Sequence, residues 1–115
     1  MSSNVQQVTA FPAVKTGVVK HVTILDDHGH AYPSDPTHIS RRAKDVVVWI
    51  SGNGAKSTVV FASPAGSPFK EIVFHVGAGE SVCSGLARED ANNGEYKYTV
   101  VGEKGANDPV VIIDN

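Results

Sequence analysis

Histidine and aspartate residues gather in one polar segment, residues 26–38, with the sequence DDHGHAYPSDPTH. In an extended backbone His28 and His30 project to the same side, because successive side chains alternate in direction. Two imidazoles with a carboxylate, or with His38, would complete a tetrahedral zinc or copper site. The same pattern is also typical of a solvated surface loop, which is the interpretation we favour. Metal binding through His28, His30 and His38 is the alternative.

Cys83 is the only cysteine, so the chain cannot form an internal disulfide. This is compatible with a reducing compartment. Cys83 falls in a short strand-like run, SVC. We expect it to be a small buried core residue rather than a metal ligand or a reactive thiol, because unpaired cysteines are among the most buried residue types.

Other segments resemble catalytic or phosphate-binding motifs, but their neighbouring residues do not fit such sites. The segment GNGAKST, residues 52–58, has Ala55 where a phosphate-binding loop needs glycine, and it is followed by a strand-like run instead of a helix. We therefore expect a hairpin connection there. No Gly-x-Ser-x-Gly nucleophile elbow occurs. Acidic pairs at 26–27 and 89–90 lie in polar loops, where solvation explains them without an acid–base role.

Composition limits the class of protein. A chain of 115 residues with 41% hydrophobic content fits one domain, which we place at residues 1–115 with a poorly structured segment at 1–16. The net charge is −2 and basic residues cluster only at RRAK, residues 41–44, so we expect no nucleic-acid partner. Neither a secretory signal nor a membrane-spanning run is visible, which predicts a cytoplasmic protein without membrane insertion.

Short runs rich in valine and isoleucine alternate with turn residues along the whole chain, the pattern of an all-β fold. We predict a single-domain Greek-key β-sandwich or barrel of about seven to eight strands. The expected strands are residues 17–25, 45–50, 57–61, 71–76, a short strand within 77–85, 95–101 and 110–114.

The two-residue period assigns side chains to faces of these strands. Trp49 lies in a run that is apolar on successive residues, so we expect a central strand with Trp49 as a core anchor. The segment 57–61 should pair back on that strand. Ile72, Phe74 and Val76 should share one face of their strand. Tyr96, Tyr98 and Val100 should likewise share one face of theirs, whereas His21 and His75 should face outward.

The order of these segments resembles the cupredoxin family over about the last 75 residues. The matching stretches are AKDVVVWISGNGAKSTVVF, then FHVGAGESV, then GEYKYTVVGEKGANDPVVIID, and GVVKHVTIL fits the N-terminal strand. The resemblance implies a cupredoxin-like sandwich. A generic immunoglobulin-like sandwich is the alternative fold.

Cupredoxins hold a type 1 copper ion with two histidines, a cysteine and usually a methionine, and the resemblance implies where these ligands would lie. The first histidine position is Ser57, the cysteine position is Val100, and the second histidine falls at or near Glu103. The only methionine is Met1. Every position departs from the family, so we expect no blue-copper site and no cofactor.

Three hypotheses follow for function. The leading one is a copper-free, non-enzymatic cupredoxin-like module, in which loops 26–38, 62–69 and 102–109 form a surface at one end for a protein or a small ligand. The second is a zinc- or copper-binding protein that uses His28, His30 and His38. The third is an enzyme with an unrecognised site, for which no catalytic residue is assigned.

Overall fold

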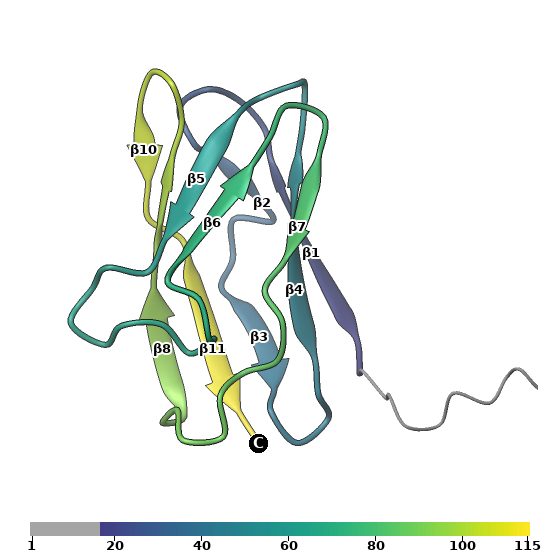
Figure 1. Ribbon diagram of the computed structural model, residues 1–115, viewed down its shortest axis with the longest axis vertical. Coiled ribbons are helices and arrows are strands. Elements are labelled where there is room, and N and C mark those ends of the chain that lie inside the picture. The colour runs from purple at the N-terminus through teal and green to yellow at the C-terminus, as the bar shows by residue number, and fades with distance from the viewer. Residues whose placement is uncertain (1–16) are drawn as a thin grey trace, which may run out of the picture.

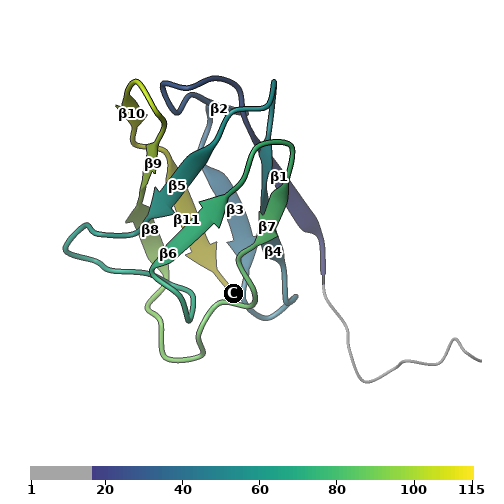
Figure 2. The ribbon, with the colours of Figure 1, turned by 45° about the horizontal axis from the view of Figure 1, so that its top comes forward.

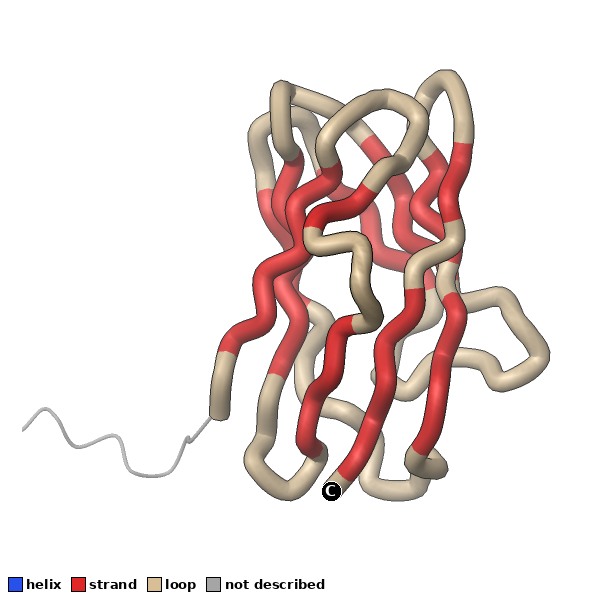
Figure 3. The backbone as a smooth tube through the Cα atoms, turned by 180° about the vertical axis from the view of Figure 1, so that it is seen from behind, coloured by secondary structure: helices blue, strands red, loops and turns tan. Residues whose placement is uncertain are grey.

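Residues 17–115, which a computed structural model describes, form a β-sandwich without helices (Figures 1 and 3). The prediction for residues 1–16 lies outside the described residues. The all-β prediction is confirmed. The eleven strands are β1 (Val19–Ile24), β2 (Ala31–Tyr32), β3 (Thr37–Ser40), β4 (Val46–Ser51), β5 (Ser57–Val60), β6 (Val73–Val76), β7 (Ser81–Cys83), β8 (Gly94–Lys97), β9 (Thr99–Val101), β10 (Ala106–Asn107) and β11 (Val110–Asp114).

The strands form three open sheets, in the orders β2-β1-β4-β7, β10-β9-β5-β6 and β3-β11-β8. The pairs β1–β4 and β3–β11 are parallel, and the other pairs are antiparallel. The turned view separates β1, β4 and β7 from β5, β6 and β9, with β3 and β11 behind them (Figure 2). The core therefore lies between sheets that face one another.

More strands form than the seven to eight expected, for two reasons. The short strands β2 and β10 lie in segments that we had assigned to polar loops, and β3 begins in the first of these loops and continues into residues to which no element was assigned. In addition, the predicted strand 95–101 is divided at Tyr98, because β8 pairs with β11 whereas β9 pairs with β5. The backbone N–H of Tyr98 donates to the carbonyl of Pro109 at 3.0 Å. The chain thus changes sheets without any break in its alternating pattern.

The predicted pairing of 57–61 back onto β4 is wrong. Both sides of β4 are occupied, by β1 and β7, and β5 pairs instead with β6 and β9 in the opposite sheet. Residues 52–56 are a crossover between sheets, in which Asn53 and Gly54 both have positive φ. The strand that follows them confirms that this loop does not open a helix. Hydrogen bonding to β1 and β7 therefore overrides the local hairpin signal.

The side chain of Trp49 is fully buried at the centre of the core, as predicted. Its ring centroid lies 4.9 Å from that of Phe74 and 5.7 Å from that of Tyr98. The indole N–H donates to the Tyr98 hydroxyl at 3.1 Å. Burial raises the pKa of Tyr98 to about 12. The phenol therefore stays protonated at neutral pH and accepts the indole bond without carrying a charge.

The buried carboxylate of Asp45 joins three strands, and it precedes β4, at the opposite end of that strand from the loop 52–56. Its two oxygens accept from the backbone N–H groups of Val18, at 2.8 Å, and Ser40, at 2.9 Å. Hydrogen bonds to an ionised acceptor are stronger than neutral ones. Asp45 therefore fixes the starts of β1 and β4 next to the end of β3.

Most predicted side-chain directions are confirmed. Tyr96, Tyr98 and Val100 are buried, and His21 and His75 are exposed. Phe74 and Val76 are buried, but Ile72 is 56% exposed because it precedes β6 and lies outside the sandwich.

The prediction that Cys83 is buried is wrong, because its side chain is exposed. Val82 packs against the core, so the alternation of β7 turns Ser81 and Cys83 toward solvent. The strand is also the last in its sheet, so nothing among residues 17–115 pairs with its outer side.

The Tyr98→Phe substitution should lower the free energy of unfolding by about 1–3 kcal/mol, because it leaves the buried indole N–H of Trp49 without an acceptor. Tyr32→Phe is the matched control, since this hydroxyl belongs to a side chain that is 65% exposed, and its effect should stay within about 0.5 kcal/mol. Denaturant unfolding measures both variants. Equal stability of the two variants would contradict a structural role for the Trp49–Tyr98 bond.

Candidate functional site

Four loops meet at one end of the sandwich, the upper end in Figure 1. They are residues 25–30 after β1, 52–56 after β4, 77–80 after β6 and 102–105 after β9. We call this the loop end. Because strands β1, β4, β6 and β9 all run toward this end, their following residues must meet there.

Two glycines let the histidine loop pack against the β9–β10 hairpin. A side chain on Gly29 would collide with the carbonyl of Val100, and one on Gly102 would collide with the carbonyl of Asp27. The backbone N–H of Lys104 donates to that Asp27 carbonyl at 2.7 Å. The histidine segment and the region assigned to the second copper histidine are therefore neighbours in space.

The three positions that the resemblance assigns to copper ligands lie at this same end. Ser57 begins β5 and Val100 lies on β9, and both side chains are buried. The register pairs Val59 with Val100 and Thr58 with Val101, so β5 and β9 are adjacent there. Glu103 follows in the exposed loop. The arrangement places a hydroxyl, an alkyl group and a carboxylate where the family has soft ligands.

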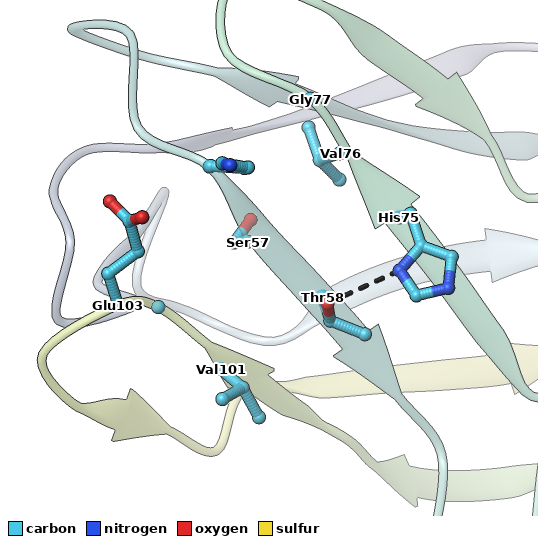
Figure 4. Close-up of a pocket in the computed structure, with 9 residues that line it drawn as sticks. Ser57, Thr58, His75, Val76, Gly77, Val101 and Glu103 are labelled. Carbon is cyan, nitrogen blue, oxygen red and sulfur yellow. Dashed lines mark hydrogen bonds between the residues drawn. The ribbon is translucent and has the colours of Figure 1, made fainter.

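Ser57 and Glu103 line an open hollow of about 350 Å³ on the outer side of β5, β6 and β9 (Figure 4). Lys56 also lines it. Figure 4 shows Thr58 and His75 turned toward each other, and Thr58 Oγ1 lies 3.4 Å from His75 Nδ1. The hollow therefore offers an ammonium, an imidazole and a carboxylate along with hydroxyl groups.

The Ser57 hydroxyl is a buried polar group at the inner margin of this hollow. Its Oγ finds no hydrogen-bond partner among residues 17–115. An unpaired buried hydroxyl costs about 1–3 kcal/mol. Serine is therefore unfavourable for stability at this position, and a ligand or water that reached Oγ would recover part of that cost.

A second hollow, also of about 350 Å³, lies on the other side of Glu103. Asp26, Asp27 and Asn53 line it with Glu103. Lys104 Nζ lies 3.8 Å from Asp27 Oδ2, so one cation partly balances the carboxylates. No short motif predicts this hollow, because its carboxylates come from loops that are distant in the chain.

His28 and His30 lie side by side, with ring centroids 6.3 Å apart. Each Nδ1 faces an aspartate: His28 lies 3.1 Å from Asp27 Oδ1 and His30 lies 2.8 Å from Asp26 Oδ2. The other oxygen of Asp26 accepts from the backbone N–H groups of His28 and His30. The aspartates thus hold both imidazoles in fixed orientations at the surface.

His38 is separate from this pair. It lies on β3, and its Nδ1 is 3.9 Å from Asp114 Oδ2 on β11. Within residues 17–115 no group of three or more histidine, cysteine, aspartate or glutamate side chains has the geometry to hold a metal ion. The structure therefore brings together two of the three histidines that the sequence nominated.

The loop at residues 62–69 does not belong to the loop end, although we had grouped it there. It follows β5, which starts at the loop end and runs away from it, so the loop projects from the side and the other end (Figure 1). Its Phe69 packs in the core against Trp49, with ring centroids 6.3 Å apart. This loop therefore contributes to the core instead of the proposed surface.

No protein-family model matches the chain, and no curated protein matches it. In the part of the chain that the structure describes, no helix is long and apolar enough to cross a membrane.

The carboxyl of Asp26 should titrate below its ordinary pKa of 3.8, mainly because the His30 side chain donates to it, against a smaller opposing effect of desolvation. Since the folded pKa is the lower one, this stabilising effect is present above pH 3.8 and is lost as the pH falls through the folded value. Carbon-detected NMR titration of Asp26 measures it.

The His30→Ala substitution should raise that Asp26 pKa toward 3.8. His28→Ala is the matched control, because His28 bonds to Asp26 only through its backbone N–H, which alanine keeps. An equal rise in both variants would show that the His30 side chain is not the cause.

Proposed function

We propose that this protein is a non-enzymatic, copper-free cupredoxin-like domain that binds a protein or a small ligand at its loop end and does not transfer electrons. The observation that carries the proposal is the identity of the side chains at adjacent positions on β5 and β9. Ser57 and Val100 both point into the sandwich there. The register makes them diagonal neighbours on the same face of the paired strands, and neither residue is a ligand for copper.

Electron transfer in a type 1 copper site depends on a thiolate bound to the metal. The only thiol of this chain, Cys83, lies on β7, in the sheet opposite β5 and β9. It borders a different hollow, together with residues of β6. The position of Cys83 therefore does not support a copper–thiolate bond at the loop end, and no other thiol is present in the chain.

The two hollows beside Glu103 support a binding role. Each has a volume of about 350 Å³, which falls within the range of about 300–1,000 Å³ for small-molecule sites. Their walls carry both charges, from Lys56 against Asp27 and Glu103, and Lys104 lies 3.8 Å from Asp27. Both hollows are open, and loops on a rigid scaffold commonly carry function. Such a surface suits a polar small ligand or a charged loop of a protein partner.

Metal binding by the histidine loop is the second candidate, and one observation favours it. His28 and His30 each direct Nδ1 at an aspartate, which is the outer-shell arrangement that orients metal-ligating imidazoles. Both Nε2 atoms are then the available ligand atoms. Two imidazoles alone would leave the remaining coordination positions to water or to a partner's side chain.

An NMR titration with Zn²⁺ and then Cu²⁺ at neutral pH separates the two candidates. If the proposed function is correct, amide shifts of residues 26–38 should not saturate at one metal ion per chain. The double substitution of His28→Ala with His30→Ala should then leave the response to metal unchanged. His38→Ala is the control, since His38 lies apart on β3. Saturable, equimolar shifts that disappear only in the double variant would favour metal binding instead.

A further inference from the structure

The strand β6 is an open edge of its sheet. It is last in the order β10-β9-β5-β6, and among residues 17–115 no strand pairs with its outer side. Phe61 donates its backbone N–H to the carbonyl of Ile72 at 2.9 Å, so this pair is a hydrogen-bonded one. Hydrogen-bonded and non-bonded pairs alternate along an antiparallel ladder. The N–H and C=O groups of Val73 and His75 therefore point outward, away from β5.

Apolar side chains surround this edge. Ile72 is 56% exposed, Val73 is 42% exposed, and Leu86 is 47% exposed. Between β6 and β7 lies a hollow of about 640 Å³, whose walls include Val73, Phe74, Val82 and Leu86. A flat edge with exposed apolar side chains is a template for another strand. The hollow gives that added strand room beside β6.

The exposed face of this edge is complementary to itself. Continuing the two-residue period of β6 back to Glu71, which lies two residues before the strand, gives the order Glu71, Val73, His75, which is an acid, an apolar group and a base. If a second copy lay antiparallel with Val73 opposite Val73, each Glu71 would lie opposite His75 of the other copy. A carboxylate can accept from an imidazole N–H, so the register gives two such contacts. On the inner face, each Ile72 would lie beside Phe74 of the other copy.

Other antiparallel registers lack this match. With Phe74 at the centre, Val73 lies opposite His75 and Glu71 lies opposite Gly77. With His75 at the centre, two imidazoles lie opposite each other. Because side chains directly opposite in a ladder interact most strongly, the register centred on Val73 is the favoured one.

We propose that two copies of this chain pair antiparallel through β6, centred on Val73, and join their four-stranded sheets into one continuous sheet. The outward groups of Val73 then form two symmetric backbone hydrogen bonds with the second copy. Ile72 and Val73 lose their contact with water in the same step. Val73 lines neither of the two loop-end hollows, so Val73→Lys changes the edge without changing them, whereas His75 also lines the hollow beside Ser57. Binding at the loop end and pairing through β6 can therefore be tested separately.

Sedimentation equilibrium from about 10 µM to about 1 mM, with reductant present to keep Cys83 reduced, tests this pairing. The full chain should form a reversible dimer with a Kd on the order of 0.1 mM. Val73→Lys should weaken it at least about tenfold, because two ammonium groups then lie opposite each other. Val101→Lys is the matched control, since Val101 is similarly exposed on β9, which has partners on both sides.

A charge exchange tests the register itself. Glu71→His alone and His75→Glu alone should each weaken the dimer, because like groups then lie opposite each other. The double variant Glu71→His with His75→Glu should restore it. Circular dichroism checks that each variant is folded. A wild-type chain that is monomeric at about 1 mM, a dimer insensitive to Val73→Lys, or a double variant no better than the single ones would overturn the proposal.

Discussion

The packing of Trp49 is the constraint on which the rest of this structure depends. The indole comes from β4, and its neighbours Phe74 and Tyr98 come from β6 and from the junction of β8 and β9. One side chain thus joins β4 to the opposite sheet and to the point where the chain changes sheets. Aromatic pairs at such distances contribute about 0.5–1.5 kcal/mol each beyond the area they bury. The hydrogen bond to Tyr98 also fixes the orientation of the indole ring, because its N–H finds its acceptor at one place in the core.

Because the centre of the sandwich is filled by this packing, the polar side chains that could bind a ligand lie at the ends and edges of the sheets. With the sheets fixed around Trp49, the directions of β1, β4, β6 and β9 bring four loops together at the loop end. Glycines at positions 29 and 102 allow the first and last of these loops to touch. Buried side chains of β5 and β9 reach this end as Ser57 and Val100, neither of which binds copper well. A rigid sandwich with mixed charges on its loops follows from these contacts.

Sequence patterns predicted much of the fold, since alternation and valine-rich runs report burial directly. Trp49, Tyr96 and Val100 were expected in the core and are buried. The predictions that failed were those of which strands pair with each other. Nothing local indicates that β5 leaves β4 for the opposite sheet, or that the chain changes sheets at Tyr98.

The candidate site was predictable only in part, for the same reason. His28 and His30 are close as expected, but in a turn closed by the Leu25–His30 backbone hydrogen bond with Gly29 at positive φ, and not in the extended backbone that was predicted. The separation of His38 and the approach of Glu103 to Asp27 depend on contacts distant in sequence. The exposure of Cys83 likewise depends on which neighbour, Val82, faces the core. Long-range pairing, which short motifs do not encode, determined each of these outcomes.

The most direct measurement is to introduce the copper ligands that the cupredoxin resemblance implies and to look for copper bound by thiolate. The variant Ser57→His, Val100→Cys, Glu103→His should remain folded and, with Cu²⁺, show the intense visible absorption of a copper–thiolate site. The variant with Ser57→His and Glu103→His alone should not show it. That result would establish that this sandwich has a cupredoxin copper position that its own side chains leave without ligands. A folded triple variant without copper–thiolate absorption would contradict the account.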